Sequence, residues 1–223
     1  MAETMSVNDV KKYSLAADFD KKLSENFRVI EFRCRDGSDP VYVSDELVGV
    51  LQKIRDYFGK AVKITSGYRT PAYDRRVGGS GGGYHTKGCA ADIIISGVKP
   101  IKIAAYADLL LGDRGGIECA AYGECRGYVH IDLRQGRWRA LKADAAKKYV
   151  SLSNLFPTVR RGGRGQAVKI LQRELNEAGF DCGDADGIFG KKTESAVKDY
   201  QKSRALAVDG ICGKKTWGKI LAE

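Results

Sequence analysis

The sequence predicts an α+β domain, built from a small antiparallel sheet with flanking helices, followed by a small three-helix module. Two patterns lead to this prediction. In the first part of the chain, short runs typical of strands are interspersed with stretches whose apolar residues recur at helical spacing. In the last part, an eight-residue segment recurs almost unchanged 23 residues further on, between further helical stripes. The repeat indicates a small unit with two matching loops.

The first predicted helix has clear start and stop signals. Val41 and Val43 flank Tyr42 in a short extended run, and Ser44 is suited to cap the helix that follows. The apolar residues of this helix are Leu47, Val50, Leu51, Ile54 and Phe58. Gly59 then ends the helix, because glycine readily adopts the left-handed conformation found at helix ends.

Three further runs predict strands of the sheet. Residues 62–65 alternate like a strand with one buried face, whereas residues 91–95 and 128–133 have the apolar pattern of buried strands. A helical stripe lies between the last two runs and consists of Ile103, Ala104, Ala107, Leu110 and Leu111. Helices and strands therefore mix along one domain.

We expect a domain over residues 1–150, a linker over 151–157 and a second domain over 158–223. Residues 186–193 and 209–216 of the second domain are identical at seven of eight positions. Each copy forms a tight turn and ends in a threonine, a residue suited to cap the helix that follows. Helical stripes lie before, between and after the copies: Val168, Leu171, Leu175 and Ala178; Ala196, Val197 and Tyr200; Trp217, Ile220 and Leu221.

Hydrophobicity and net charge limit the kinds of partner that this protein can have. No apolar run is long enough to cross a bilayer, so we expect no membrane insertion. The formal net charge of +10 favours an anionic partner. Nucleic acid is not expected, because the chain has no zinc-finger spacing, basic helix or aromatic-basic RNA-binding pattern. A phosphate-rich or carboxylate-rich cell wall fits a diffuse positive surface equally well, and charge alone does not decide between partners. We expect the protein to be a monomer.

Six cysteines occur, without any Cys-x-x-Cys pair that would indicate a cysteine-only zinc knuckle. Cys182 and Cys212 either form a disulfide or remain two small buried thiols. Residues 1–15 carry acidic and polar residues where a signal peptide needs an apolar core, so no signal peptide is expected.

The chain contains only two histidines, and an aspartate follows each of them. Asp92 comes seven residues after His85, and Asp132 comes two residues after His130. Catalytic zinc sites use three histidine or carboxylate ligands and keep a fourth position for water. Asp92 opens an isoleucine-rich strand, where a carboxylate is costly without a partner such as a metal ion. The pattern predicts one Zn²⁺ per chain, with two ordinary structural histidines as the alternative.

The whole pattern resembles the zinc D-Ala-D-Ala carboxypeptidase family, which also includes vancomycin-resistance dipeptidases and phage endolysins. The residues that carry this resemblance are His85, Gly88, Ala90, Asp92, His130 and Asp132, with the segments 66–71, 76–79 and 136–138. Residues 158–221 resemble the peptidoglycan-binding domain found at the ends of many wall hydrolases. That second resemblance rests on the two loop copies and on residues 159–162, 171–172 and 200–201.

The resemblance implies that His85, Asp92 and His130 are the zinc ligands. It also implies that Arg69 lies beside the metal, where a guanidinium holds the scissile carbonyl oxygen or a substrate carboxylate. Peptidoglycan would be the partner of both domains.

The general base stays open at this point. Asp132 points to the same face of its strand as His130, so it is either the base or a partner that orients a ligand. Glu124 and Glu118, in the predicted loop before that strand, are rivals. Many relatives have a Glu three residues, or a His two residues, before the last ligand, where this chain has Gly127 and Tyr128. Tyr128 is either a hydrogen-bond donor to the transition state or a packed strand residue.

The sequence thus predicts a zinc metallopeptidase, endolysin-like, that hydrolyses an amide bond in the stem peptide or cross-link of bacterial cell wall. L-alanyl-D-glutamate, D,D cross-links and terminal D-alanine are all open as substrates. The enzyme would stay in the host cytoplasm until a holin releases it to the wall, or leave by another export route. The alternative is a non-catalytic wall-binding protein with a structural zinc site.

Overall fold

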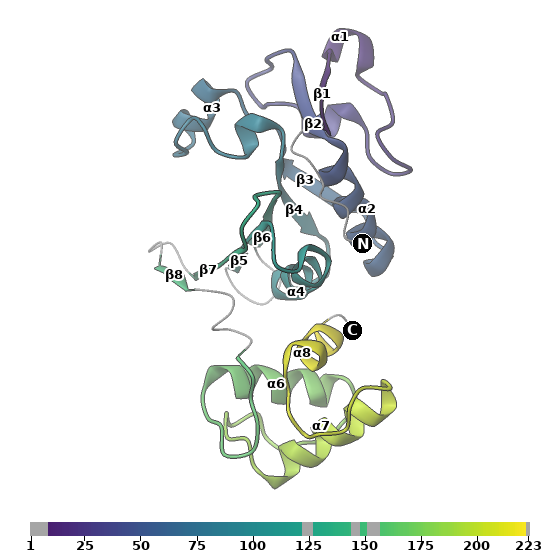
Figure 1. Ribbon diagram of the computed structural model, residues 1–223, viewed down its shortest axis with the longest axis vertical. Helices are drawn as coiled ribbons and strands as arrows, with labels where there is room; N and C mark the ends of the chain where they lie inside the picture. The colour runs from purple at the N-terminus through teal and green to yellow at the C-terminus, as the bar shows by residue number, and fades with distance from the viewer. Residues whose placement is uncertain (1–8, 122–126, 144–147, 151–156, 222–223) are drawn as a thin grey trace. The chain divides into compact units, whose positions relative to one another are not determined.

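The computed structural model describes residues 9–121, 127–143, 148–150 and 157–221. The chain divides into two compact units, Met1–Trp138 and Arg139–Glu223, and each is described by itself (Figure 1). The expected limits 1–150, 151–157 and 158–223 stay a prediction, since most of the linker lies outside the described residues.

The first unit begins with a two-stranded sheet and short helical segments. β1 (Val10–Tyr13) pairs antiparallel with β2 (Val41–Ser44). The elements in this region also include α1 (Leu15–Asp18), the 3-10 helix η2 (Val29–Phe32), α2 (Asp45–Phe58), α3 (Pro71–Arg76) and the 3-10 helix η3 (His85–Lys87). The start and stop signals predicted for α2 are confirmed. The Ser44 hydroxyl accepts a hydrogen bond from the Leu47 amide, and Gly59 is left-handed.

The larger sheet has the strand order β3-β4-β6-β5-β7-β8. Its strands are β3 (Val62–Ser66), β4 (Ala90–Ile95), β5 (Gly116–Ala121), β6 (Gly127–Asp132), β7 (Trp138–Ala143) and β8 (Lys148–Val150). Every pair among β3, β4, β6 and β5 is antiparallel, and β8 pairs antiparallel with β7. The α+β class and the three predicted strands are confirmed, while β1, β5, β7 and β8 were not expected from the sequence.

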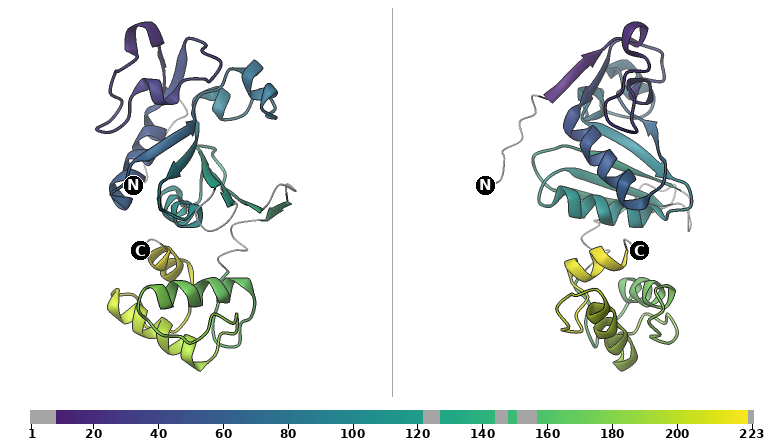
Figure 2. Two further views of the ribbon diagram at one scale, coloured as in Figure 1. Left: turned by 180° about the vertical axis from the view of Figure 1, so that it is seen from behind. Right: turned by 90° about the vertical axis from the view of Figure 1, so that its right-hand side faces the viewer.

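Helices cover one face of this sheet. α4 (Pro100–Leu111) packs along β5 and β6, and α2 lies beside it against β3 (Figure 2). The residues that strands β4, β6 and β5 turn towards this layer are fully buried: Ile93, Val129, Cys119, Ala91, Ile131 and Ile117. Because side chains alternate along a strand, the residues between them face the other way. Those residues include Asp92 and His130.

The second unit contains the three expected helices. They are α6 (Gln166–Glu177), α7 (Lys191–Ser203) and α8 (Lys214–Ile220). The predicted threonine caps are wrong. Gly190 and Gly213 occupy the N-cap positions, and Thr193 and Thr216 are the third residues of α7 and α8.

The two threonines are buried because each one belongs to a repeated hydrogen-bond network. Gln172 donates to Asp186, to the Ile188 carbonyl and to Thr193, at 2.9, 3.1 and 3.2 Å. The second copy repeats this pattern from Gln201 to Asp209, Ile211 and Thr216, at 2.8, 3.0 and 3.1 Å. Each glutamine oxygen also accepts an amide proton from the glycine of its loop. The sequence repeat therefore specifies two equivalent loops, each held by one buried glutamine.

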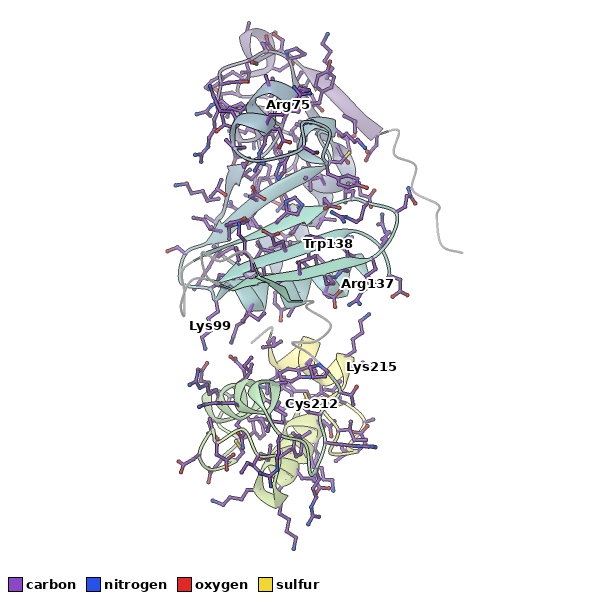
Figure 3. All side chains as sticks on the ribbon, turned by 90° about the vertical axis from the view of Figure 1, so that its left-hand side faces the viewer. Arg75, Lys99, Arg137, Trp138, Cys212 and Lys215 are labelled. Carbon is purple, nitrogen blue, oxygen red and sulfur yellow. The ribbon has the colours of Figure 1, made fainter. Side chains whose placement is uncertain are left out.

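No disulfide joins Cys182 to Cys212. Both are buried free thiols, and the Cys182 thiol donates to the Gln172 carbonyl at 3.3 Å. Cys212 lies inside the helical unit (Figure 3), where burial raises the pKa of its thiol well above the usual value. Among the described residues, no helix has the length and hydropathy needed to span a membrane.

Candidate metal centre

A row of polar side chains crosses the other face of the larger sheet. Asp92 on β4 pairs with His130 on β6, and His130 pairs with Glu118 on β5. Residues directly opposite in antiparallel strands turn their side chains to the same face, with Cβ atoms about 4.5–5.5 Å apart. Asp132 and Tyr128 lie two residues either side of His130 and share this face. The sheet thus brings together residues from three strands.

His85 reaches the row from outside the sheet. It begins η3, and its Nδ1 contacts the Gly67 carbonyl oxygen at 2.7 Å. A carbonyl only accepts hydrogen bonds, so Nδ1 carries the proton and Nε2 of the neutral ring is an acceptor. Gly67 can hold this position because its backbone lies against Phe32. A Cβ at residue 67 would lie 2.7 Å from the Phe32 Cα.

His130 is oriented in a similar way by Asp132. Its Nε2 lies 3.0 Å from the Asp132 carboxylate, which accepts a hydrogen bond from the ring N–H, so that Nδ1 of the neutral ring is an acceptor. Burial would lower the pKa of His130, but hydrogen bonds with Asp132 and Asp92 raise it to about 9. The surroundings of this ring therefore favour positive charge, either as a second proton on Nδ1 facing Asp92 or as a cation in the place of that proton.

Three acceptor atoms converge at one point. His85 Nε2 lies 3.1 Å from His130 Nδ1 and 3.3 Å from Asp92 Oδ1, and the last two atoms are 2.9 Å apart. Acceptors this close repel one another unless a proton or a cation lies between them. Tetrahedral zinc, with Zn–N bonds of about 2.0–2.1 Å, separates its ligand atoms by about 3.3 Å. The donor set and its spacing therefore fit a zinc ion.

Arg69 lies beside the cluster, and its guanidinium is engaged within the protein. It donates to the Asp92 carboxylate at 2.7 Å, to Asp74 at 3.2 Å and to the Ser66 hydroxyl at 2.8 Å. Asp74 is buried, with 3% of its surface exposed. Its position in the sequence does not single it out. Burial would raise the pKa of Asp92, but contacts with His130 and His85 keep it well below its usual range. Asp92 is thus held ionised, with one oxygen towards the histidines and the other on Arg69.

Arg134 is a second residue that sequence reasoning missed. It donates to both oxygens of Asp132, at 2.8 and 2.6 Å, and lies 4.4 Å from the Trp138 ring, labelled in Figure 3. Asp132 is fully buried. Burial would raise the pKa of Asp132, but His130 and Arg134 keep it well below its usual range. Arg134 follows the end of β6, and its only signal in the sequence was its closeness to Asp132.

The rival bases fall in different places. Glu124 lies outside the described residues. Glu118 was expected in a loop, and this placement is wrong, because the residue lies within β5. Its carboxylate accepts a hydrogen bond from the Tyr128 hydroxyl at 3.1 Å. The alternation of residues 116–121 could have indicated the strand, but small residues and glycine weaken that pattern.

Both parts of the chain match known protein families. Residues 22–132 match the Peptidase M15 family, and residues 164–220 match a peptidoglycan binding domain family. The type VI secretion system spike protein VgrG3 of Vibrio cholerae is 39% identical over 95 residues, which cover 35% of this chain and 9% of that protein. The zinc D-Ala-D-Ala carboxypeptidase of Streptomyces albus G is 40% identical over 67 residues, covering 28% of this chain and 26% of that protein.

A solved structure is also similar in part. The Burkholderia AP3 phage endolysin shares 44% identity over 28% of this chain and 24% of its own, with a TM-score of 0.28. The first two curated relatives, VgrG3 and an uncharacterised Kitasatospora aureofaciens protein, are matched over 9% and 55% of their own lengths. This chain therefore spans less than two thirds of these relatives.

Proposed function

We propose that this chain, which carries a Peptidase M15 domain followed by a peptidoglycan binding domain, is a zinc-dependent peptidase of bacterial cell wall. The observation that carries the proposal is the convergence of three acceptor atoms, from His85, Asp92 and His130, at 2.9–3.3 Å. One Zn²⁺ per chain held by these atoms would polarise the scissile carbonyl and lower the pKa of water.

The surrounding residues fix the orientation of the three ligands. The Gly67 carbonyl holds His85, Arg69 holds Asp92, and Asp132 holds His130. Such partners set the tautomer and direction of a ligand and raise its affinity for metal. We therefore assign Asp132 an orienting role rather than the role of base. Its full burial and its two-pronged contact with Arg134 support this choice.

Arg69 is proposed to act first on Asp92. A contact between Arg69 and a substrate oxygen stays a prediction, and it would require the guanidinium to exchange one of its three present partners. A partly buried arginine that pairs with two carboxylates is a rigid support for a ligand, because moving it leaves those carboxylates unpaired.

The second unit would hold the enzyme on the wall. Binding to an insoluble polymer raises the effective concentration of substrate near the catalytic unit. The order of the two domains fits an endolysin-like enzyme that reaches the wall through a holin or by another export route. The route to the wall can be tested by adding the purified protein to permeabilised and to intact cells and following the turbidity of each suspension. Lysis of permeabilised cells alone is the expected result.

Digestion of purified sacculi tests the proposed reaction. We expect new amino termini to appear, to vanish with a chelator and to return with zinc, and mass spectrometry of the products identifies the bond. His85→Ala should abolish the release while the protein still sediments with sacculi. Wild-type protein that sediments with sacculi but releases nothing at any zinc level would instead support a binding protein with a structural zinc site.

A further inference from the structure

Three carboxylates lie around the candidate metal centre, on the face of the larger sheet that points away from α2 and α4. Two of them have cationic partners. Asp92 is paired with Arg69 at 2.7 Å, and Asp132 is paired with Arg134 at 2.6 Å. The third, Glu118, forms no ion pair with any residue that the structure describes. Glu118 is buried even so, with only 9% of its surface exposed. A buried carboxylate without a cation is costly, so it is a candidate for a functional role.

The register of the sheet places Glu118 beside a candidate zinc ligand. Its Cα pairs with that of His130 across β5 and β6, so both side chains rise from the same face. The Tyr128 hydroxyl donates to Glu118 Oε1 at 3.1 Å. Within the described part of the chain, Oε2 accepts no hydrogen bond. One oxygen is therefore held by a neutral donor, and the other is available to a water molecule.

We propose that Glu118 is a catalytic residue that orients the attacking water and takes its proton. This inference rests on the proposed peptidase function. It assigns this proton transfer to a residue of β5, the strand that pairs with β6, which carries the candidate ligand His130. The residues that come just before His130 in the sequence are not given this role. Gly127 has no side chain for this step, and Tyr128 contributes by holding the Glu118 carboxylate.

The proposed step is balanced in atoms and charge. Water gives one proton to Glu118 Oε2 while its oxygen forms a bond to the amide carbon. Glu118 then returns the proton to the amide nitrogen as the C–N bond breaks. The products are a carboxylic acid and an amine, and the acid passes its proton to the amine to give a carboxylate and an ammonium group. Glu118 ends in its starting form, and no other reactant is needed.

The test compares Glu118→Gln with wild type on soluble muropeptides released from sacculi by a glycosidase. We expect kcat to fall by about 10²- to 10⁴-fold, the usual contribution of a positioned acid or base. KM and zinc affinity, measured by competition with a chromophoric chelator, should stay as in wild type. The control is Asp108→Asn, which removes an α4 carboxylate paired with Arg137 at 3.0 Å and should leave kcat unchanged.

Chemical rescue separates a proton acceptor from a structural residue. Formate should restore turnover to Glu118→Ala, because a small carboxylate can occupy the space of the missing one. A loss that formate does not restore would overturn the assignment. If Glu118→Gln does not fold, Glu118→Asp provides the test, since it keeps the carboxylate at a longer reach and should lower kcat with zinc retained.

Other results would count against Glu118 in distinguishable ways. Wild-type kcat in Glu118→Gln would refute the inference, and a matching loss in Glu124→Gln would move the role to that residue. A fall in kcat that follows a fall in zinc affinity would make Glu118 a structural residue. Wild-type protein that releases no amines, with or without zinc, would remove the proposed function and this inference together.

Discussion

Asp132 contacts a candidate zinc ligand on one side and an arginine on the other. Both interactions are with its carboxylate, which is fully buried. A carboxylate so enclosed has no path to exchange a proton with substrate, but it can hold a ring in place. An orienting residue and a base predict different results on substitution, so the two roles can be separated.

Asp132→Asn should lower zinc affinity by about 10- to 100-fold, the usual effect of removing a residue that orients a metal ligand. The amide nitrogen of asparagine would face Arg134 or His130, both donors, so the His130 ring would lose its fixed direction. Chelator competition measures the affinity, with Asp108→Asn as the control. Unchanged affinity with lost turnover would instead make Asp132 the base.

Gly116 leaves the space that the Asp132–Arg134 ion pair occupies. A Cβ at this position would lie 2.2 Å from the Asp132 carboxylate and 2.6 Å from Arg134 Nε. Gly116→Ala should therefore destabilise the unit by about 1–3 kcal/mol, as overpacking does, and also weaken zinc binding. Calorimetry measures the first effect and chelator competition the second. Gly136→Ala is the control, because a Cβ there meets nothing within 4 Å. Equal melting temperatures in the two variants would contradict this account.

At the scale of elements, the two loops of the helical unit behave as copies. The Asp186 pKa is lowered by hydrogen bonds from Gln172 and the Ile188 amide, and the Asp209 pKa by those from the Ile211 amide and Gln201. A carboxyl whose pKa is lower in the folded state stabilises the fold above its unfolded pKa. That contribution is lost as the pH falls through the lower, folded value.

The helical unit should therefore lose stability as the pH falls below about 4, the unfolded pKa of aspartate. The variant with both Asp186→Asn and Asp209→Asn keeps an oxygen acceptor in each loop but removes the carboxyl group that titrates there. Its urea midpoint, followed by Trp217 fluorescence, should change less between pH 6 and pH 3 than that of wild type. An identical acid response in the two proteins would show that other groups govern it.

At the scale of the whole molecule, the two compact units have separate cores. The first is built around strands β3, β4, β6 and β5, and the second around Tyr200, Phe189 and Trp217. If one unit is catalytic and the other binds the wall, the rate of hydrolysis should depend on the linker between them only when the substrate is an insoluble polymer.

Cutting a protease site inserted in the predicted linker, residues 151–157, should leave amine release from soluble muropeptides unchanged. Release from sacculi should fall by about 10²-fold, at the lower end of the gain that linking two binding events provides. The uncut protein from the same preparation is the control. Equal loss on both substrates would indicate that the units depend on each other for folding or catalysis.

Several features of this protein followed from the sequence alone. The strand and helix patterns between residues 41 and 133 depend on local periodicity, as do the three helices of the second unit. The His85, Asp92 and His130 set stood out because the chain has only two histidines, each followed by an aspartate. The loop repeat was visible as near-identity, which needs no structure to detect.

Tertiary structure decided how these parts are used. Strand pairing joins residues far apart in the chain, so the register that sets Glu118 opposite His130 has no local signal. The contact between Arg69 and Asp92 also has no local signal. Nor does the burial of Thr193, which was expected to cap a helix and instead bonds to Gln172. Periodicity determines which way a side chain faces along its own strand or helix. Only packing determines what it meets there, because each partner comes from another element.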